Sequence, residues 1–204
     1  RLTLRGFDQG RLGYTLDGIP LGNMSYGNSN GLHISRAVIS ENLASAEVST
    51  GIGALGTPSN SNLGGVMQFF SSDPSTESGV TFGQSFGSDR AQRTYARLDT
   101  GEHNGVSAYL SGVYSDVDKW KGWGSQELRQ VSGKASYWFG DDNRLTATLH
   151  SSRRVEADYQ DLSLEMVDRL GWDWDNYAPD WQRAVNAANS QFEGNVTGIY
   201  ELGV

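Results

Sequence analysis

Residues 130–139 read Gln-Val-Ser-Gly-Lys-Ala-Ser-Tyr-Trp-Phe, and this stretch decides the fold. Val131 and Phe139 lie on one parity of the stretch, whereas Ser132 and Lys134 lie on the other. Successive side chains of a β-strand point to opposite faces, so the pattern predicts a strand with one apolar and one polar face. Soluble β-sandwiches and membrane barrels both contain such strands, so alternation alone leaves the architecture open.

The same alternation recurs on both sides of this stretch. It is present at residues 80–86, 106–111 and 144–150, and in each segment apolar and polar residues take opposite parities. Runs of this kind, bounded by Gly, Asn and Asp, predict consecutive β-strands joined as an antiparallel meander. We expect about six strands between residue 78 and the last residue.

The connections between these strands alternate in length. Residues 102–105 and 140–143 predict tight turns, whereas residues 116–125 and 153–190 form longer loops. Outer-membrane barrels show this asymmetry, because their periplasmic turns are short and their extracellular loops are long. The short loop at residues 88–89 is the exception. The connections therefore favour an antiparallel up-and-down transmembrane β-barrel.

Composition and charge argue against several other classes of protein. The chain has 204 residues, no cysteine and a formal net charge of −8, so disulfides and thiolate metal sites are excluded. Phosphate contacts need clustered Lys and Arg, so the acidic balance argues against a nucleic-acid partner. The sequence contains no apolar run of about 20 residues, which a transmembrane helix requires. Its 26 glycines and its aromatic residues favour a β protein.

The chain changes character at a proline. Residues 1–75 are dense in Gly, Asn and Ser, and Asp17-Gly18 between apolar neighbours predicts a tight turn. Pro74 cannot continue a hydrogen-bonded ladder, so the segment around it is a natural linker. We therefore expect one domain at residues 1–75 and a set of strands with one long loop at residues 76–204.

No group of residues predicts a catalytic or metal site. Residues 51–56 match a Gly-x-Gly-x-x-Gly pattern, but Pro58 and the polar residues after it disfavour the helix that a dinucleotide site requires. His33, His103 and His150 are far apart and lack metal-ligand spacing. We expect a protein that is not an enzyme and that needs no cofactor or metal.

The longer loops carry candidates for ligand contact. Trp120 and Trp123 form either an aromatic girdle with local packing or a stacking surface for a sugar ring or an aromatic chelator. In the long loop, Asp161 predicts the start of a short helix closed by Gly171, and Pro179 predicts the start of a second. This loop is either a folded surface loop or a lid over a ligand entrance.

Two pairs of carboxylates lie in the same loops. Asp116 with Asp118, and Asp173 with Asp175, are either paired-carboxylate or calcium sites or solvated loop residues. Neither pair completes the spacing of a calcium loop, so the second interpretation is favoured.

A series of short segments resembles, in order, the second half of the plug domain of TonB-dependent outer-membrane receptors. The segments are Arg5-Gly6-Phe7, Leu16-Asp17-Gly18-Ile19-Pro20-Leu21, Ile34-Ser35-Arg36-Ala37-Val38, Leu55-Gly56 and Asn62-Leu63-Gly64-Gly65-Val66-Met67-Gln68-Phe69. The alternating strands after Pro74 look like the first strands of that family's barrel. The resemblance thus covers nearly the whole chain.

The resemblance implies a fold, a location and a function. The fold would be mainly β, with part of a mixed α/β plug domain followed by barrel strands, incomplete here because the family's barrels have about 22 strands. Members lie in outer-membrane lipid and import a scarce nutrient, usually a ferric siderophore, heme, cobalamin or a carbohydrate. Energy comes from the inner membrane through a TonB-type partner, whose contact segment would lie upstream of Arg1. The transport involves no bond chemistry.

The resemblance also implies which residues contact the small-molecule nutrient. The family's plug presents apical loops to its ligand. By motif these loops contain Arg5, Gly22, Asn23, Met24, Tyr26, Leu32 and His33. An arginine there can donate a charged fork, and a tyrosine can stack. Trp120 and Trp123 would add contacts from an extracellular loop.

The sequence departs from the family pattern in one segment. Many members have Glu before the Arg of this segment and Arg-Gly-Pro soon after it. Here Ser35 precedes Arg36, and Glu41-Asn42-Leu43 occupies the second place. A salt-bridge lock between plug and barrel therefore cannot be copied from other members.

Three hypotheses remain for the function. The first is an outer-membrane receptor for a ferric chelate or a carbohydrate, and the acidic balance slightly favours a neutral or cationic ligand. The alternative is a secreted or surface β-sandwich that binds glycans through Trp120 and Trp123, and an enzyme is third. The apolar strand faces distinguish the first two, because they meet lipid in a barrel and a packed second sheet in a sandwich.

Overall fold

The computed structural model describes residues 3–22, 32–50, 57–58, 63–140 and 142–175. The described residues before the linker contain short strands and helical turns. These are β1 (Thr3–Leu4), β2 (Phe7–Asp8), η1 (Gln9–Arg11), β3 (Leu12–Leu16), β4 (Ile19–Pro20), α1 (Ile34–Ala37), η2 (Ser40–Asn42), β5 (Leu43–Thr50) and β6 (Gly65–Ser71). Long strands and one further helix follow the linker. These are β7 (Ser78–Phe86), β8 (Gln92–His103), β9 (Val106–Asp118), β10 (Ser125–Phe139), β11 (Asn143–Glu156) and α2 (Leu164–Leu170).

The first part of the chain forms a four-stranded sheet, which we name the plug sheet, with strand order β4-β3-β6-β5. Strand β6 is parallel to β3 on one side and antiparallel to β5 on the other. The buried apolar core beside the plug sheet contains Leu12, Tyr14, Leu16, Ala37, Val38 and Phe69. The plug sheet is thus held together by ordinary burial of apolar side chains.

The turn between β3 and β4 confirms the prediction made from Asp17-Gly18. Leu16 pairs with Ile19, and the two residues between them have φ angles of 49° and 79°. Positive φ at both central positions is the geometry of a type I′ hairpin turn, which Asp-Gly sequences favour.

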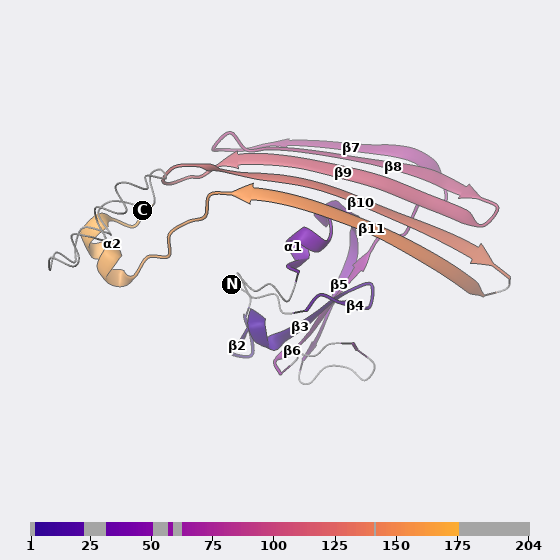
Figure 1. Ribbon diagram of the computed structural model, residues 1–204, viewed down its shortest axis with the longest axis horizontal. Helices are drawn as coiled ribbons and strands as arrows, with labels where there is room; N and C mark the ends of the chain where they lie inside the picture. The colour runs from indigo at the N-terminus through magenta and orange to yellow at the C-terminus, as the bar shows by residue number, and fades with distance from the viewer. Residues whose placement is uncertain (1–2, 23–31, 51–56, 59–62, 141, 176–204) are drawn as a thin grey trace. The chain divides into compact units, whose positions relative to one another are not determined.

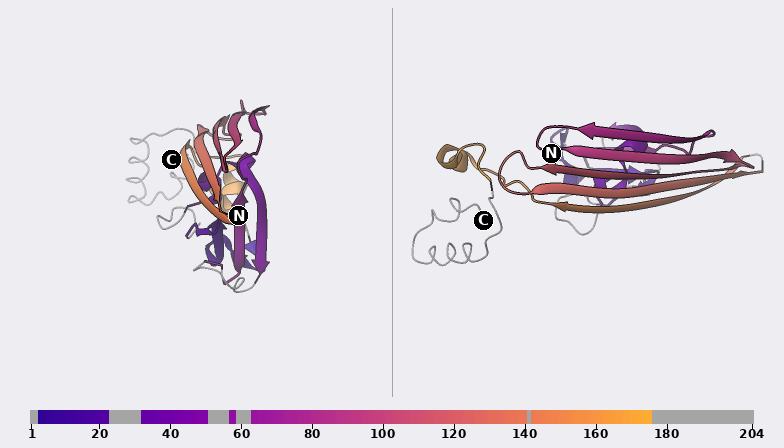
Figure 2. Two further views of the ribbon diagram at one scale, coloured as in Figure 1. Left: turned by 90° about the vertical axis from the view of Figure 1, so that its right-hand side faces the viewer. Right: turned by 90° about the horizontal axis from the view of Figure 1, so that it is seen from above.

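Strands β7 to β11 form a five-stranded sheet, which we name the wall sheet, with strand order β11-β10-β9-β8-β7 (Figures 1 and 2). Neighbours in the sheet are also neighbours in sequence, and short connections between adjacent strands require antiparallel pairing. The tight turn predicted at residues 102–105 is confirmed, with Asn104 and Gly105 at φ of 53° and 79° in the connection from β8 to β9. The turn predicted at residues 140–143 includes residue 141, which lies outside the described residues. The described residues contain these five strands, and a sixth would fall outside them.

Burial in the wall sheet differs from burial in the plug sheet, where every residue of β3 is buried. On the polar parity of β9 and β10, Ser111 is 3 % exposed and Ser132 is 1 % exposed. On the apolar parity of β8 and β9, Leu98 and Leu110 are both 55 % exposed. A sheet that buries its polar face and exposes its apolar face is typical of a barrel wall in lipid. The predicted alternation is therefore confirmed, and its apolar face points outward.

By its internal contacts the chain divides into two compact units. The first comprises residues 1–83, 94–114 and 129–153, and the second comprises residues 84–93, 115–128 and 154–204. The predicted domain boundary between residues 75 and 76 cuts the sequence at one point, whereas these units each combine several separate segments. That boundary stays a prediction.

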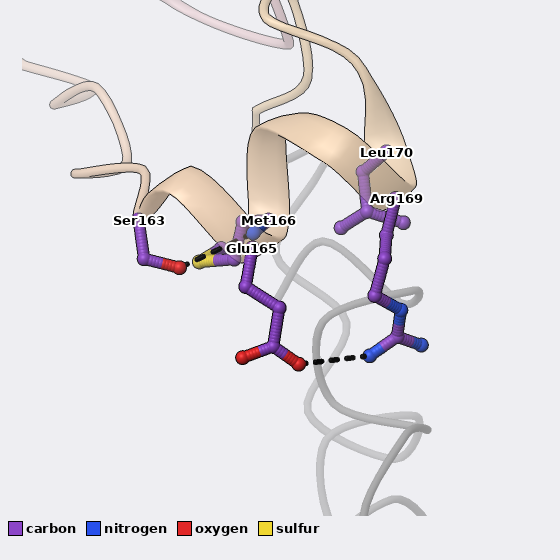
Figure 3. Close-up of a pocket in the computed structure, with 5 residues that line it drawn as sticks. All are labelled: Ser163, Glu165, Met166, Arg169 and Leu170. Carbon is purple, nitrogen blue, oxygen red and sulfur yellow. Dashed lines mark hydrogen bonds and ion pairs between the residues drawn. The ribbon is translucent and has the colours of Figure 1, made fainter.

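Helix α2 begins at a different residue from the one expected. Ser163 is its N-cap and accepts a hydrogen bond from the Met166 amide, so the prediction of Asp161 as the cap is wrong (Figure 3). Asp161 is too far upstream for its carboxylate to take an N-cap bond to Met166. Gly171 ends the helix with φ of 93°, as predicted. No helix in the described ranges is both long and apolar enough to cross a membrane.

Candidate functional site

In the first unit the plug and the wall sheet touch through a group of neutral side chains centred on Asn42. Asn42 is fully buried, its Nδ2 donates to Ser111 Oγ at 2.7 Å, and its Oδ1 accepts from Tyr95 Oη at 2.8 Å. Beside it, Ile39 packs with Tyr95 and Val113 in a small apolar cluster. We name these five residues the neutral contact, because their polar groups form hydrogen bonds with one another and carry no formal charge.

A second group of contacts, which carries charge, holds the linker. Arg144 donates to both Asp73 oxygens at 2.6 and 3.0 Å, and Lys134 Nζ lies 3.0 Å from the same carboxylate. The Arg144 guanidinium, with a smaller contribution from Lys134, lowers the pKa of Asp73 to about 2, against the opposing effect of burial. Asp73 is therefore ionised throughout the physiological pH range.

Two further wall residues, Arg97 and Asp99, also bind the linker. Arg97 donates to Ser72 Oγ at 2.7 Å, to the Asp73 carbonyl at 3.0 Å and to Asp99 at 2.8 Å. Asp99 in turn accepts from the Ser75 amide at 2.9 Å. We name the four wall residues Arg97, Asp99, Lys134 and Arg144, together with residues 71–75, the linker clamp.

The linker clamp borders a cavity. It is open to solvent and has a volume of about 600 Å³. The plug contributes the β3–β4 turn and the linker to its lining, and the wall contributes β10 and β11. The lining residues are Asp17, Gly18, Ile19, Phe70, Ser71, Asp73, Lys134, Arg144, Thr146 and Thr148. This cavity is lined by both polar and apolar side chains and is large enough for a small hydrated solute.

In the second unit two loops form an aromatic cluster around Trp120. Its ring stacks on Trp172 at 5.2 Å between centroids and lies 6.2 Å from the ring of Tyr159. Lys121 Nζ lies 5.4 Å from the Trp120 centroid and donates to the Trp174 carbonyl at 3.1 Å. The expected local packing is thus present for Trp120, while Trp120 and Trp172 keep about half or more of their surface exposed.

A buried ion pair joins the same two loops. Lys119 Nζ lies 2.6 Å from Asp175, and both side chains are almost fully buried. Lys119 also donates to the Asp158 carbonyl at 2.7 Å, and Asp175 accepts from the Gln160 amide at 2.7 Å. A buried charge needs such partners, so this pair fixes the shape of the cluster.

The carboxylate pairs of the loops do not form a metal centre in the described part of the chain. Asp118 is bound by both Arg90 nitrogens, and Asp175 is bound by Lys119. Within the described ranges no three carboxylate or imidazole groups lie close enough to hold a metal ion. Asp118 and Asp175 are therefore partners of cations. The favoured interpretation, that these aspartates are solvated loop residues, is wrong for Asp175, because its side chain is buried.

The small hollow on α2 does not serve as a ligand site. It measures about 30 Å³ and is lined by residues of the helix itself (Figure 3). Glu165 and Arg169 lie on its rim with 3.9 Å between their charged atoms. A volume of this size holds water and excludes a nutrient.

The predicted apical residues of the plug are only partly described. Arg5 is exposed in the β1–β2 turn with φ of 51°, and Gly22 has φ of 74°. The Leu32 amide donates to the Leu21 carbonyl at 2.8 Å, which brings Leu32 beside the chain that leads to Gly22. His33 accepts from the Ser35 amide and so caps α1.

Several predictions fall on residues outside the described ranges. These are the ligand contacts Asn23, Met24 and Tyr26, the glycine pattern at residues 51–56 and the helix expected from Pro179. Trp123 is described and exposed. Its predicted role, like that of Trp120 and of the apical residues, stays a prediction.

Sequence reasoning missed the linker clamp and Trp172. A signal for Lys134 was present, because it lies on the polar parity of β10, where an ammonium that turns inward needs an anionic partner. No comparable signal identified that partner, since Asp17 and Asp73 are two among many acidic residues. Trp172 lies in the long loop at residues 153–190, for which the sequence predicted two short helices and no aromatic partner for Trp120.

The solved structures that this chain resembles are outer-membrane receptors. The pyoverdine receptor FpvA of Pseudomonas aeruginosa is 20 % identical over 72 % of this chain and 21 % of its own, with a TM-score of 0.57. The siderophore receptor PiuA of Acinetobacter baumannii is 17 % identical over 72 % of this chain and 20 % of its own, also with a TM-score of 0.57. No protein-family profile and no curated protein sequence matches the chain.

These likenesses establish the fold. The chain spans about a fifth of the length of the receptors it matches. Both are built from a plug and a barrel, and the two sheets of this chain correspond to part of each. The wall sheet is not closed within the described residues.

Proposed function

We propose that this chain is part of a TonB-dependent receptor that lies in the outer membrane of a bacterium and imports a scarce nutrient. The plug would close the barrel, outer-membrane lipid would surround the wall sheet, and a TonB-type partner would supply energy from the inner membrane. The nutrient would be a small molecule, and neither nucleic acid nor bond chemistry would be involved.

One observation carries this proposal: the wall sheet buries its polar face against the plug and exposes its apolar face. On β10, Ser132 and Lys134 are buried and Val131 is exposed. Leu98 on β8 and Leu110 on β9 are exposed in the same way. In water an exposed apolar face of this extent is unfavourable, whereas in hydrocarbon it is the favourable surface. A β-sandwich would cover that face with a second sheet, so the glycan-binding module is not favoured.

The ferric siderophores are the first choice of cargo. The receptors with the same fold are described as receptors for pyoverdine and for a siderophore. Carbohydrate remains the second choice, because an exposed Trp120–Trp172 stack suits a sugar ring as well as a flat chelate. The fold does not discriminate between these cargoes, since the residues that touch the ligand lie in loops.

The experiment uses the full-length protein in its own bacterium. We expect it in the outer-membrane fraction, and we expect a deletion strain under iron limitation to lose uptake of radiolabelled ferric siderophore. Loss of uptake of a labelled oligosaccharide, with iron uptake intact, would assign the second cargo. A protein in the soluble fraction would contradict the proposal as a whole.

The candidate ligand residues are tested on the same receptor. We expect Trp172→Ala and Trp120→Ala to weaken ligand binding about tenfold, because each removes stacking area from an exposed aromatic surface. Leu164→Ala is the matched control, since Leu164 is a highly exposed apolar residue of the same loop. Isothermal titration with the imported ligand gives the affinities. Equal affinities of all three variants would remove the cluster from the site, and Arg5→Ala would then test the plug.

A further inference from the structure

Two hydrogen bonds set the register between β10 and β11, which are neighbours in the wall sheet (Figure 1). The Ala157 amide donates to the Ser125 carbonyl at 3.0 Å, and Gln130 Nε2 donates to Ser152 Oγ at 3.3 Å. Both bonds join residues that lie opposite each other in one and the same antiparallel register. The pairing is therefore regular over the part of the two strands that is nearest the long loops.

In this register Arg129 of β10 lies directly opposite Arg153 of β11, and both point outward. Gln130 is 4 % exposed and is bonded to Ser152, so these two neighbours of the arginines point toward the inside of the wall. Successive side chains of a strand alternate between faces, which gives the arginines the parity of the exposed Val131. The two arginines thus lie beside each other on the face that carries the exposed apolar residues.

The arginine pair lies at the level expected for lipid headgroups. At the turn end of β10 the rings of Tyr137 and Phe139 stack at 5.4 Å between centroids on the same parity, as in an aromatic girdle. From Phe139 to Arg129 the strand runs for about ten residues, roughly 33 Å, which at a tilt of about 40° gives a height of about 25 Å, the height of the apolar band of outer-membrane barrels. The outward residues between the two levels are uncharged: Val131, Gly133 and Ala135 on β10, and Leu145, Ala147, Leu149 and Ser151 on β11. Arg129 and Arg153 are thus the first charged side chains beyond that band.

The positive charge of this pair is not fully balanced. Like charges that lie opposite each other on a sheet destabilise the pairing. Glu127, the next residue of β10 on the same parity, can balance one of the two arginines. Within the described ranges no carboxylate is paired with Arg153, whereas the adjacent Arg154 is paired with Glu156. The pair therefore keeps a positive charge that an anion from outside the chain can satisfy.

From this arrangement we infer that Arg129 and Arg153 bind the phosphate group of a lipid headgroup in the outer leaflet of the membrane. Phosphate oxygens match the geometry of guanidinium forks, and their charge removes the repulsion between the two arginines. The ring of Tyr114 on β9, 5.5 Å from the Arg129 guanidinium, favours the same level, because aromatic side chains collect at membrane interfaces. The inference rests on the proposed function, because it needs a wall that lies in the outer membrane.

The test measures lipid binding by the full-length receptor in detergent. Native mass spectrometry gives the affinities for dihexanoyl phosphatidic acid, whose headgroup is a phosphate monoester, and for dihexanoyl phosphatidylcholine, whose phosphate is masked by choline. We expect the wild type to bind phosphatidic acid about tenfold more tightly, because charge-assisted bonds to phosphate are strong. The double variant Arg129→Gln/Arg153→Gln should lose this preference. Inorganic phosphate at the concentration of the lipid should not displace it.

The matched control is the neighbouring arginine on the same strand. Arg154 points to the opposite face from Arg153 and is paired with Glu156. Arg154→Gln removes the same charge from the protein and should leave the preference for phosphatidic acid unchanged. Arg153→Lys, which keeps the charge and loses the fork, should keep part of the preference.

The outcomes separate the lipid site from the proposed function. Equal affinities of the wild type for the two lipids would overturn the site, and so would an unchanged preference in the double variant. An equal loss in Arg154→Gln would assign the effect to net charge, and displacement by inorganic phosphate would assign it to free phosphate; either result overturns the lipid site. If the double variant does not fold, Arg153→Gln alone decides. A wild-type receptor that imports no nutrient contradicts the proposed function, whatever lipids it binds.

Discussion

The plug sheet and the wall sheet differ in how their strands are buried. The plug strand β3 is buried along its whole length, whereas the wall strand β9 buries one parity and leaves the other more exposed. In the plug sheet Leu12, Tyr14 and Leu16 are buried on β3. In the wall sheet Leu110 on β9 is exposed while its neighbours Tyr109 and Ser111 are buried. The comparison teaches that period-two alternation specifies a strand, and that the solvent on each side specifies which face turns inward.

The largest expected effect comes from making the same substitution in both sheets. Leu12→Ala should destabilise the plug by about 2–5 kcal/mol, because it leaves a cavity in a packed core. Leu110→Ala should cost far less, because lipid or detergent fills the space. Hydrogen exchange of the β3 and β9 amides in the full-length receptor measures both. Equal losses would show that the two sheets do not differ in the way burial indicates.

The next effect sharpens the comparison by placing charge on the outward face. Leu110→Arg should destabilise the inserted barrel by about 2–4 kcal/mol, and Val106→Arg by about 0–1 kcal/mol, because Val106 lies beside the turn at the membrane interface. Equilibrium refolding of the full-length protein into lipid vesicles gives these values. If Leu110→Arg refolded as well as Val106→Arg, the outward face would not be a lipid face.

A smaller effect is expected where the two sheets meet. Asn42→Ala should cost about 1–3 kcal/mol, because the hydroxyls of Tyr95 and Ser111 lose their buried partner. The double variant with Ser111→Ala should lose less than the sum of the single losses, since one interaction is counted twice. Thermal unfolding of the plug in the full-length receptor measures the cycle. Strict additivity would indicate that the two side chains do not interact.

The smallest effect concerns pH. The folded-state pKa of Asp73 is lowered from 3.8 to about 2, so its contribution is complete above pH 3.8 and is lost as the pH falls toward 2. Asp73 is more than half exposed, so solvent screening limits this contribution to about 1 kcal/mol. Plug stability measured at several pH values should therefore stay flat above about pH 5. In Asp73→Asn the acid-side loss should be smaller, and an unchanged loss would assign it to other carboxylates.

Much of the fold followed from local sequence. Asp17-Gly18 predicted the turn between β3 and β4, and the alternation at residues 130–139 predicted β10. These features depend on neighbouring residues alone, because φ preference and side-chain parity are local properties. The cap of α2 was wrongly placed for a related reason, since Asp161 and Ser163 are both good caps and only the folded loop selects Ser163.

The candidate sites depended much more on the folded structure. Trp120 was found from its sequence, but its partner Trp172 comes from another loop. Arg144 of the linker clamp meets Asp73 across 71 residues of chain. Asn42 makes neutral bonds to Tyr95 and Ser111, which lie 53 and 69 residues away in the sequence.

The sequence by itself determined the strands, the tight turns, the alternation of short and long connections and the absence of cysteine chemistry. The tertiary structure alone decided which face is buried and which charges meet. Gln130 donates to the carbonyl of Ser35 across 95 residues of chain, and Lys134 meets Asp17 across a similar separation. Such contacts depend on the closure of long segments by many weak interactions at once, and no local preference of either residue encodes the partner.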